Sequence, residues 1–307
     1  MVTPVVAVVG PTASGKTALA VDLCLALGGE VINTDAVQLH RGMDIGSAKA
    51  TPAERRGVPH HLLDVLDVRD EANVAQFQVM ARAAIDDVHR RGRLPVLVGG
   101  SSLYVRAAVD PLQFPGTDPR VRRYWSDRLA REGPESLHAL LADRDPAAAA
   151  AMLPTNGRRI VRALEVVEIT GRPFAATMPP PVSIYPGLVM IGLDVPREEL
   201  DARIDARVDR MWADGFVEEV RALTGLAEAP TASRALGYQQ VLQYLAGEIG
   251  EDDARTATQA GTRRFARRQD RMLRKDPRVH WLPFDAPDRL ERAVAIVAEN
   301  EAPAAAP

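Results

Sequence analysis

A glycine-rich loop near the amino end constrains the fold of this 307-residue chain more than any other feature. The segment GPTASGKT, residues 10–17, fits the phosphate-binding pattern G-x-x-x-x-G-K-[ST] at every fixed position. It follows a short β-branched run at residues 5–9 and opens a helical pattern that reaches Leu27. A chance match in a random loop would lack this context. The segment therefore predicts a phosphate cradle between a buried strand and a helix.

The strand–loop–helix alternation continues through the first third of the chain. Residues 30–33 and 94–98 are short apolar runs typical of buried parallel strands, and residues 62–65 form a weaker one. Asn73 caps an amphipathic helix that runs to Arg91. Alternation of this kind predicts an α/β fold, a P-loop NTPase-like parallel sheet flanked by helices.

The pattern changes after about residue 114. Helical patterns alone follow, at residues 120–132, 134–142, 146–152 and 158–170, up to a proline-rich stretch at 179–186. Strand character returns at 188–195, and helices are predicted at 196–212, 216–223, 238–246 and 252–274, before a last strand at 280–282. We expect a catalytic core of residues 1–113 and 183–300, an inserted all-helical subdomain of residues 114–182, and a disordered tail at 301–307.

Composition excludes several classes of protein. The net charge of -3 means that any nucleic-acid surface must be a local patch. The single cysteine, Cys24, excludes an internal disulfide framework and reads as a small buried hydrophobic residue. No run reaches the roughly 18 apolar residues of a membrane span, and the amino end lacks the basic region of a signal peptide. We expect a cytoplasmic protein.

The loop indicates a polyphosphate rather than ATP in particular, although the motif alone would be labelled ATP-binding. An ATPase of this fold usually has an apolar strand that ends in Asp and helps to hold the metal. Here the strand at 94–98 ends in Gly99-Gly100-Ser101, and Asp194, at the end of a later strand, is followed at once by Pro196 and a helix. The sequence therefore favours a loop that holds a departing diphosphate.

Asp35 lies just beyond the carboxyl end of the second strand. Ligands of open α/β sheets bind at that edge, where a carboxylate can serve as a base or assist a metal. The same residue can simply cap the turn that follows. Position alone does not decide between these roles.

Several long segments resemble one family, the tRNA dimethylallyltransferases, also called tRNA isopentenyltransferases or the IPP transferase family. These are GPTASGKT, the N-x-D-x-x-Q-x-x-RGMDIG-x-AK string at residues 33–49, and LVGGSSLY at 97–104. RRIVRALEV, SRALGYQQV and TRRFARRQDRMLR, which begin at residues 158, 233 and 262, are similar to further family segments. The matches reach from the phosphate loop to about Leu282.

The resemblance implies transfer of the dimethylallyl group from its diphosphate to N6 of adenosine 37, in tRNAs that read codons beginning with U. The products would be N6-(dimethylallyl)adenosine and diphosphate. The cofactor would be Mg²⁺. Asp35 would take the proton of the poorly nucleophilic exocyclic amine. Lys16, Thr17 with Mg²⁺, and Arg234 would stabilise the leaving diphosphate, and Ser101 would donate to a phosphate oxygen or touch the tRNA. The implied diphosphate-binding residues are Gly10, Pro11, Thr12, Ala13, Ser14, Gly15, Lys16 and Thr17.

The family also implies that a flipped-out base reacts and that the inserted subdomain grips the anticodon stem-loop. One protein around one anticodon arm predicts a monomer. The implied tRNA contacts are Asp35, Ala36, Val37, Gln38, Ser101, Arg122, Arg158, Arg159, Ile160, Val161, Arg162, Arg263 and Arg267. The arginines at 263–274 have almost no acids among them, which favours a phosphate-contacting face over an ordinary solvated helix. Arg162 alone can equally be the ion-pair partner of Glu165 or Glu168.

Four positions depart from the family pattern, and they affect the details of tRNA contact rather than the reaction class. Ala36 stands in place of a serine, His40 of a tyrosine, Arg158 of a glutamine and Met272 of a tryptophan. The pair His60-His61 has no third metal ligand at a sensible spacing and is interpreted as structural. Tyr124 and Trp125 are predicted to pack in the core of the subdomain.

Three rival functions remain. A P-loop small-molecule or nucleotide kinase would need a phosphate donor, but neither a helical insertion nor an arginine-rich helix. A prenyltransferase of free adenine nucleotides would modify AMP without tRNA. A non-catalytic RNA-binding protein would have no reason to retain Lys16, Thr17 and Asp35 together.

Overall fold

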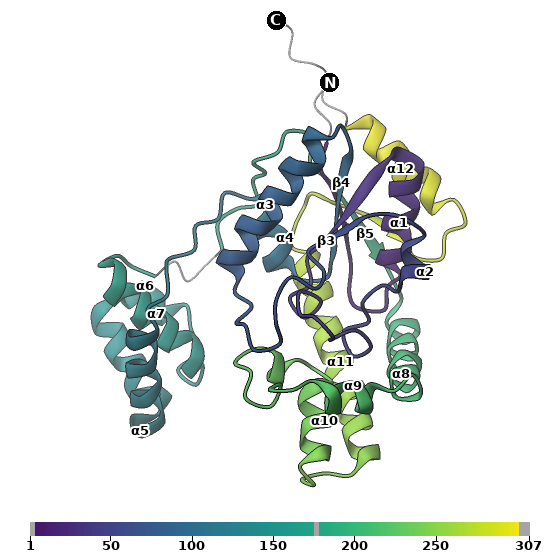
Figure 1. Ribbon diagram of the computed structural model, residues 1–307. Helices are drawn as coiled ribbons and strands as arrows, with labels where there is room; N and C mark the ends of the chain where they lie inside the picture. Colours follow the sequence, from purple (N-terminus) through teal and green to yellow (C-terminus); the bar gives the residue numbers. More distant parts are fainter. Residues whose placement is uncertain (1–3, 175–177, 301–307) are drawn as a thin grey trace, which may run out of the picture. The chain divides into compact units, whose positions relative to one another are not determined.

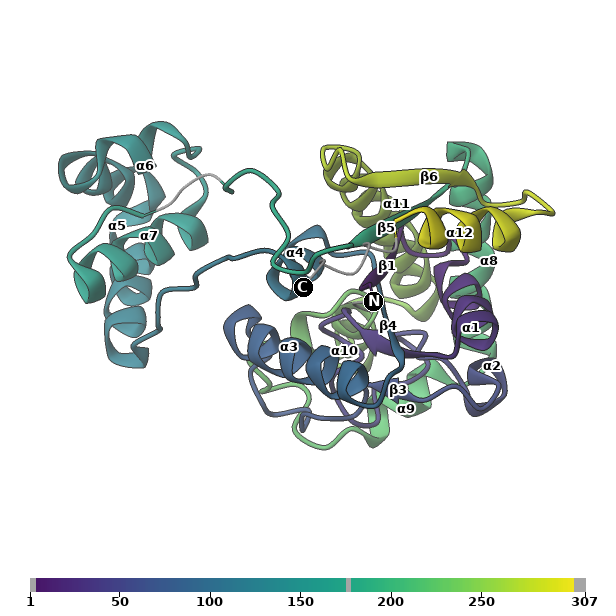
Figure 2. The ribbon, with the colours of Figure 1, turned by 90° about the horizontal axis from the view of Figure 1, so that it is seen from above.

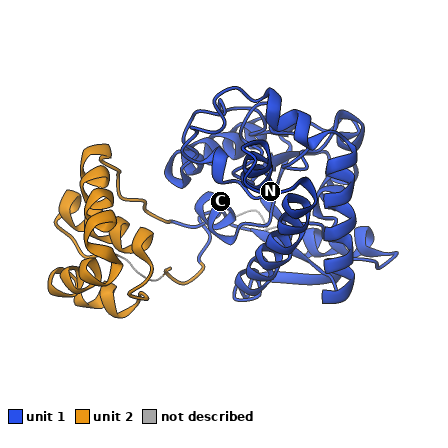
Figure 3. Cartoon of the chain, turned by 90° about the horizontal axis from the view of Figure 1, so that it is seen from below, with its two compact units in different colours: residues 1–111, 182–307 blue, residues 112–181 orange. Residues whose placement is uncertain are grey.

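The computed structural model describes residues 4–174 and 178–300 and divides into two compact units, coloured separately in Figure 3. Unit 1 comprises residues 1–111 and 182–307, and unit 2 comprises residues 112–181. The tail predicted to be disordered lies outside the described residues. Among the described residues, no helix combines the length and the apolar character that a bilayer span requires.

Unit 1 is built on a six-stranded sheet in the order β3-β2-β4-β1-β5-β6, and every neighbouring pair is parallel. The strands are β1 (Val6–Val9), β2 (Gly29–Asn33), β3 (His60–His61), β4 (Leu94–Gly99), β5 (Val189–Asp194) and β6 (Val279–Pro283). The central β1 is buried along its whole length, as its unbroken apolar run predicts for a strand covered on both faces.

Helices cover both faces of this sheet (Figure 2). On one face α1 (Lys16–Leu27) packs beside α12 (Arg289–Glu299), and on the other α3 (Val74–Arg90) packs beside α4 (Ser102–Val109). Cys24 is buried in α1, and burial raises its thiol pKa to about 12, so it is the inert core residue that the sequence predicts. The predicted α/β fold is confirmed.

Four further helices of unit 1 gather beyond the carboxyl ends of the strands, below the sheet in Figure 1. They are α8 (Arg197–Ala213), α9 (Phe216–Ala222), α10 (Tyr238–Leu245) and α11 (Glu251–Leu273). A separate apolar cluster, which includes Met43, Phe216 and Tyr238, joins α9 and α10 to the loop after β2. This group of helices therefore has its own core. The short helices α2 (Pro52–Arg55) and η1 (Ala232–Arg234) complete the unit.

Unit 2 contains α5 (Pro119–Arg144), α6 (Pro146–Ala150) and α7 (Gly157–Thr170). Gly133, with φ of 79°, interrupts α5 just before Pro134, so two helical segments meet there as predicted. Trp125 is buried and donates its indole N–H to Glu168 at 2.9 Å, whereas Tyr124 beside it is half exposed. Trp125 is therefore a core residue, and Tyr124 is not.

The structure corrects the strand predictions at one place and adds four helices, the short α2 and η1 and the longer α4 and α12. The strand expected at 62–65 is wrong: β3 ends at His61, because Leu62 and Asp64 adopt left-handed φ angles of 61° and 60° that no strand allows. The predictions omit α4, whose last five residues are all buried and so lack an amphipathic period. They also omit α12, whose apolar positions do recur at helical spacing.

Candidate functional site

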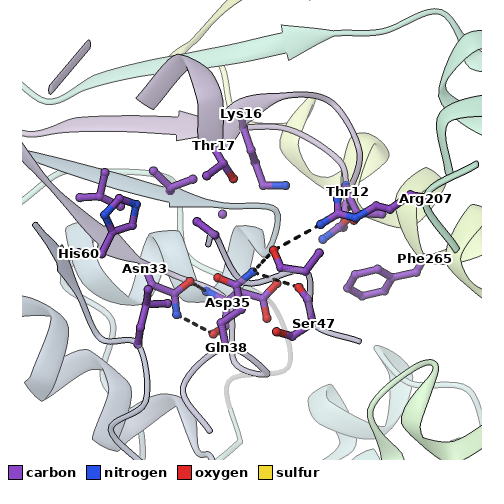
Figure 4. A pocket seen from close by; sticks show the side chains of 17 residues that line it. Thr12, Lys16, Thr17, Asn33, Asp35, Gln38, Ser47, His60, Arg207 and Phe265 are labelled. Atoms are coloured by element: carbon purple, nitrogen blue, oxygen red, sulfur yellow. Dashed lines mark hydrogen bonds between the residues drawn. The ribbon is translucent and has the colours of Figure 1, made fainter. Parts of the chain in front are cut away.

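One pocket lies where the carboxyl ends of β1, β2 and β4 meet (Figure 4). The phosphate loop and the start of α1 contribute Thr12, Lys16 and Thr17 to its lining, and the segment after β2 contributes Asp35 and Gln38. Its remaining walls come from Val31, Asn33, Ser47, Ala48, Ala50, His60, Leu63, Val98, Gly99, Arg207, Phe265 and Gln269. The structure thus brings the predicted phosphate cradle and the predicted carboxylate into one cavity.

Two helices from the far end of the chain brace the phosphate loop. The side chain of Gln269, on α11, accepts the backbone N–H of Thr12 at 2.9 Å. Arg203, on α8, donates to the carbonyl of Ala13 at 2.9 Å, and its guanidinium lies over the ring of Phe284. Ala13 holds a left-handed φ of 65°, which a non-glycine residue adopts only where neighbours enforce it. These contacts fix the loop before any ligand arrives.

The pocket holds two cations close to one carboxylate. Burial and the nearby Arg207 guanidinium lower the pKa of Lys16 to about 8, while the carboxylate of Asp35 opposes that shift. Burial also lowers the pKa of Arg207, again against the influence of Asp35. Desolvated cations that are not fully balanced favour an incoming anion. This electrostatic arrangement suits a di- or triphosphate.

Asp35 is held by a local network with one oxygen left over. Asn33 accepts the Asp35 backbone N–H and donates to the Asp35 carbonyl, both at 2.9 Å, and it also donates to the carbonyl of Leu62 at 3.0 Å. The Oδ1 atom of Asp35 accepts the N–H of Val37 at 2.9 Å. Within the described residues Oδ2 has no hydrogen-bond partner. The carboxylate therefore caps the turn and still offers an oxygen to a ligand.

The histidine pair lies on the short edge strand β3. His61 contacts the carboxylate of Glu30 at 2.6 Å, and Nδ1 of His60 lies 2.9 Å from the carbonyl of Val58. Burial lowers the pKa of His60, and its buried Nε2 has no partner among the described residues. His60 therefore contributes a neutral ring to the pocket wall.

Two predicted catalytic residues lie away from this pocket lining. Arg234 lines a second hollow, together with Ala36 and Val37. Ser101 begins α4, where its hydroxyl accepts the N–H of Tyr104 at 3.4 Å. Asp194, at the end of β5, pairs with Arg274 and is not part of the pocket lining. The arginine that the structure places beside Lys16 is Arg207.

The predicted RNA-binding residues of unit 2 differ in what they expose. Arg122 and Arg162 both bind the buried carboxylate of Glu165, at 2.6 and 2.8 Å, so the structural alternative for Arg162 is confirmed. Ile160 and Val161, also predicted to contact RNA, have side chains buried in the core of the unit, so only their backbone is open to such a contact. The remaining two, Arg158 and Arg159, are exposed, and Arg159 lies over the ring of Phe174.

The arginines of α11 have acidic partners that the sequence around them does not reveal. Arg267 pairs with Asp201 at 2.7 Å, and Arg263 pairs with Asp205, both acids being on α8. The scarcity of acids among the arginines of α11 therefore does not leave these two residues without acidic partners. Met272 is exposed, as are Arg264 and Arg271.

Sequence reasoning missed two polar residues of the pocket that come from distant helices. Arg207 and Gln269 lie far along the chain from the phosphate loop, and only their positions on α8 and α11 bring them to it. Tyr104, which lies outside the pocket lining, has a pKa raised to about 12 by burial and by the Asp35 carboxylate. The available signal for Arg207 was its spacing from Arg203: residues four apart share one face of a helix.

Comparisons with known proteins agree with one another. The family model described as IPP transferase matches residues 38–276, well over half of the chain. A tRNA dimethylallyltransferase of Thermobifida fusca is 63% identical over 303 residues, covering 96% of this chain and 95% of its own.

Two solved structures are also similar. A full-length tRNA isopentenylpyrophosphate transferase from Bacillus halodurans is 37% identical with a TM-score of 0.70, covering 97% of this chain and 98% of its own. A eukaryotic dimethylallyltransferase acting on tRNA is 25% identical with a TM-score of 0.78, covering 97% of this chain and 79% of its own. This chain belongs to the IPP transferase family.

Proposed function

We propose that this protein transfers the dimethylallyl group from dimethylallyl diphosphate to N6 of adenosine 37 in tRNAs that read codons beginning with U. One observation carries the proposal: Lys16, Arg207 and Asp35 line the same pocket, and β4, which ends at Gly99, contributes no carboxylate to that lining. Two cations suit a diphosphate that leaves, and the carboxylate suits an amine that must lose a proton. The family membership of the chain supports the same reaction.

The chemistry follows from these groups. The N6 nitrogen forms a bond to the allylic carbon while the bond from that carbon to the diphosphate oxygen breaks, and the diphosphate carries away the bonding pair. Lys16, Arg207 and the loop amides would stabilise the negative charge that grows on the departing oxygen. The N6 proton passes to Oδ2 of Asp35, the oxygen that the turn does not use. Asn33 fixes the orientation of the backbone at Asp35 during the transfer.

The residues present fit a magnesium ion bound largely through the substrate. Thr17 offers a hydroxyl to the pocket, and the described residues contain no group of three or more His, Cys, Asp or Glu side chains suited to a metal. Mg²⁺ commonly keeps several waters and takes its other ligands from phosphate oxygens, so Thr17 would be its main protein ligand. When bound, the ion would neutralise charge on the diphosphate.

The RNA side of the proposal draws on exposed basic residues. Arg158 and Arg159 in unit 2 and the arginines of α11 would contact the anticodon stem-loop, and a flipped adenine would enter the pocket beside Asp35. We further propose that the protein acts as a monomer in the cytoplasm and that the loop binds diphosphate rather than ATP.

The direct test incubates the protein, Mg²⁺ and dimethylallyl diphosphate with unmodified tRNA and analyses the nucleosides by mass spectrometry. N6-(dimethylallyl)adenosine should appear at position 37, with one diphosphate released per nucleoside formed. Asp35→Asn should reduce kcat by roughly a hundred- to ten-thousandfold, the usual contribution of a general base, and should leave donor affinity nearly unchanged. Asp67→Asn removes an exposed-loop carboxylate outside the pocket lining and serves as the control.

Two outcomes would contradict the proposal. Consumption of ATP with phosphate appearing on a small acceptor, and no modified nucleoside, would identify a kinase. Modification of AMP at the same rate as tRNA would identify a prenyltransferase of free nucleotides.

A further inference from the structure

The carboxylate of Glu219, on α9, receives four hydrogen bonds although it lies outside the pocket. Its Oε2 accepts the consecutive backbone N–H groups of Asp44 at 2.9 Å and Ile45 at 2.6 Å. Its Oε1 accepts the N–H of Gly46 at 3.1 Å and the hydroxyl of Tyr238 at 2.7 Å. Successive backbone N–H groups that converge in this way form a concave anion site. Here the chain fills that site with its own side chain.

The turn that Glu219 holds is tightly packed. A Cβ atom built on Gly46 would lie only 2.0 Å from the ring of Phe216 and 2.8 Å from the ring of Tyr238, so the backbone approaches both aromatic residues closely. On the other side the buried Lys49 donates to the side chains of Asp44 and Asp64, at 2.5 and 2.6 Å. Displacement of residues 44–46 would therefore disturb contacts on two sides.

The same turn continues directly into the wall of the pocket. The carbonyl oxygens of Ser47 and Ala48 accept hydrogen bonds from the side-chain amide of Gln38, at 3.1 and 3.4 Å. The carbonyl of Ala48 also lies 3.5 Å from a guanidinium nitrogen of Arg207. In Figure 4, Gln38 and Ser47 lie on the side of the pocket that carries Asp35, and Lys16 and Thr17 lie on the opposite side.

We propose that Glu219 is a positioning residue for the acceptor side of the site. By fixing residues 44–46, Glu219 holds the carbonyl groups of Ser47 and Ala48 in place. These carbonyls orient the side-chain amide of Gln38, and the adenine rests against that amide beside Asp35. Glu219 touches no substrate itself. The proposal rests on the proposed function for the identity of the acceptor. It assigns Glu219 to acceptor binding and alignment, and leaves the diphosphate cradle to the loop and α8.

The test is the near-isosteric substitution Glu219→Gln. An amide offers one accepting oxygen where the carboxylate offers two, so at least one of the four donors loses its partner. We expect kcat/KM for tRNA to fall by about tenfold or more, and by about a hundredfold for Glu219→Ala, as small misplacements of reacting groups commonly do. The affinity for dimethylallyl diphosphate alone, measured by calorimetry, should change by less than about twofold, because the phosphate loop keeps its own braces.

Glu218→Gln is the matched control. It is the preceding residue of the same helix, its side chain is 69% exposed and it pairs only loosely with Arg221 at 3.7 Å. Neither kinetics nor donor affinity should change. If Glu219→Gln fails to fold, Tyr238→Phe removes one of the four donors and should give the same pattern more weakly. Equal losses of donor affinity and of kcat/KM would overturn the proposal, because Glu219 would then support the pocket as a whole.

A second readout does not depend on activity. In the ligand-free protein, Glu219→Gln should speed hydrogen exchange in peptides that cover residues 44–48 while leaving exchange at residues 10–17 unchanged. Unchanged exchange at 44–48 would sink the positioning role even if the wild-type protein proved inactive on tRNA. Inactivity of the wild type, with the exchange pattern as expected, would instead refute only the proposed function.

Discussion

At the scale of single residues, the pocket holds two cations against one carboxylate. Burial lowers the pKa of both Lys16 and Arg207, and a nearby guanidinium adds to each shift, that of Arg207 for Lys16 and that of Arg210 for Arg207. The Asp35 carboxylate opposes both shifts without cancelling them. A bound diphosphate would relieve the remaining repulsion, so the ligand would complete the electrostatics of the site.

Lys16 gives this account a pH signature. Its pKa of about 8 in the protein lies below the ordinary lysine value of 10.5, so the neutral amine already dominates above pH 8. The affinity for dimethylallyl diphosphate, whose phosphate oxygens stay ionised in this range, should fall as pH rises through about 8. The contribution of Lys16 to the free energy of unfolding changes with pH in the opposite direction to the donor affinity. It should rise between pH 8 and 10.5, where the unfolded chain binds more protons than the folded one.

Calorimetric titrations with the donor from pH 6.5 to 9.5, alongside thermal unfolding at the same pH values, measure both trends. Lys16→Arg keeps a cation that stays charged throughout, so its donor affinity should be flat with pH even if it is weaker overall. A pH-independent wild-type affinity would show that the ammonium of Lys16 does not meet the diphosphate.

At the scale of elements, α8 and α11 are joined by a ladder of charged pairs. Asp201, Asp205 and Asp209, spaced by four residues on α8, contact Arg267, Arg263 and Arg255 on α11. The same two helices carry Arg207 and Gln269 to the phosphate loop. The ladder therefore aligns the helices that complete the pocket, and its exposed arginines can also meet RNA phosphates.

Salt dependence separates these two roles of Arg267. If it contacts a tRNA phosphate, Arg267→Ala should weaken RNA binding and reduce the slope of log affinity against log salt by about 0.7 to 0.9. Asp201→Asn, which removes only its partner, should strengthen RNA binding or leave it unchanged. Filter-binding titrations at several salt concentrations would show this. Two variants that lower the melting temperature alike and share the wild-type slope would mean that the pair is purely structural.

The sequence predicts where the helices of this chain lie better than which distant residues their side chains contact. The long helix at 251–273 is predicted almost to its ends, because its periodicity is a local property. The aspartates that neutralise Arg263 and Arg267 lie about sixty positions away, and no pattern around those arginines indicates them. The role of Glu219 escapes sequence reasoning for the same reason, since its four donors come from the turn after β2 and from α10.

At the scale of the whole molecule, the parallel sheet follows from the phosphate motif and the strand–helix alternation, and its parallel order is observed. Lys16, Thr17 and Asp35 could be predicted to meet because residues that follow the carboxyl ends of parallel strands lie at one edge of the sheet. The arginine that lies beside Lys16 could not be predicted this way. Arg234 carries the family resemblance, yet it lines the second hollow, and the fold of α8 places Arg207 beside Lys16.

The most direct test of the central claim is a crystal structure with an unreactive thio analogue of dimethylallyl diphosphate bound. The account predicts the diphosphate within the loop of residues 10–17, with oxygens near the side chains of Lys16 and Arg207 and the allylic carbon facing Asp35. A diphosphate seated in the second hollow, at Arg234 and away from Lys16, would contradict it.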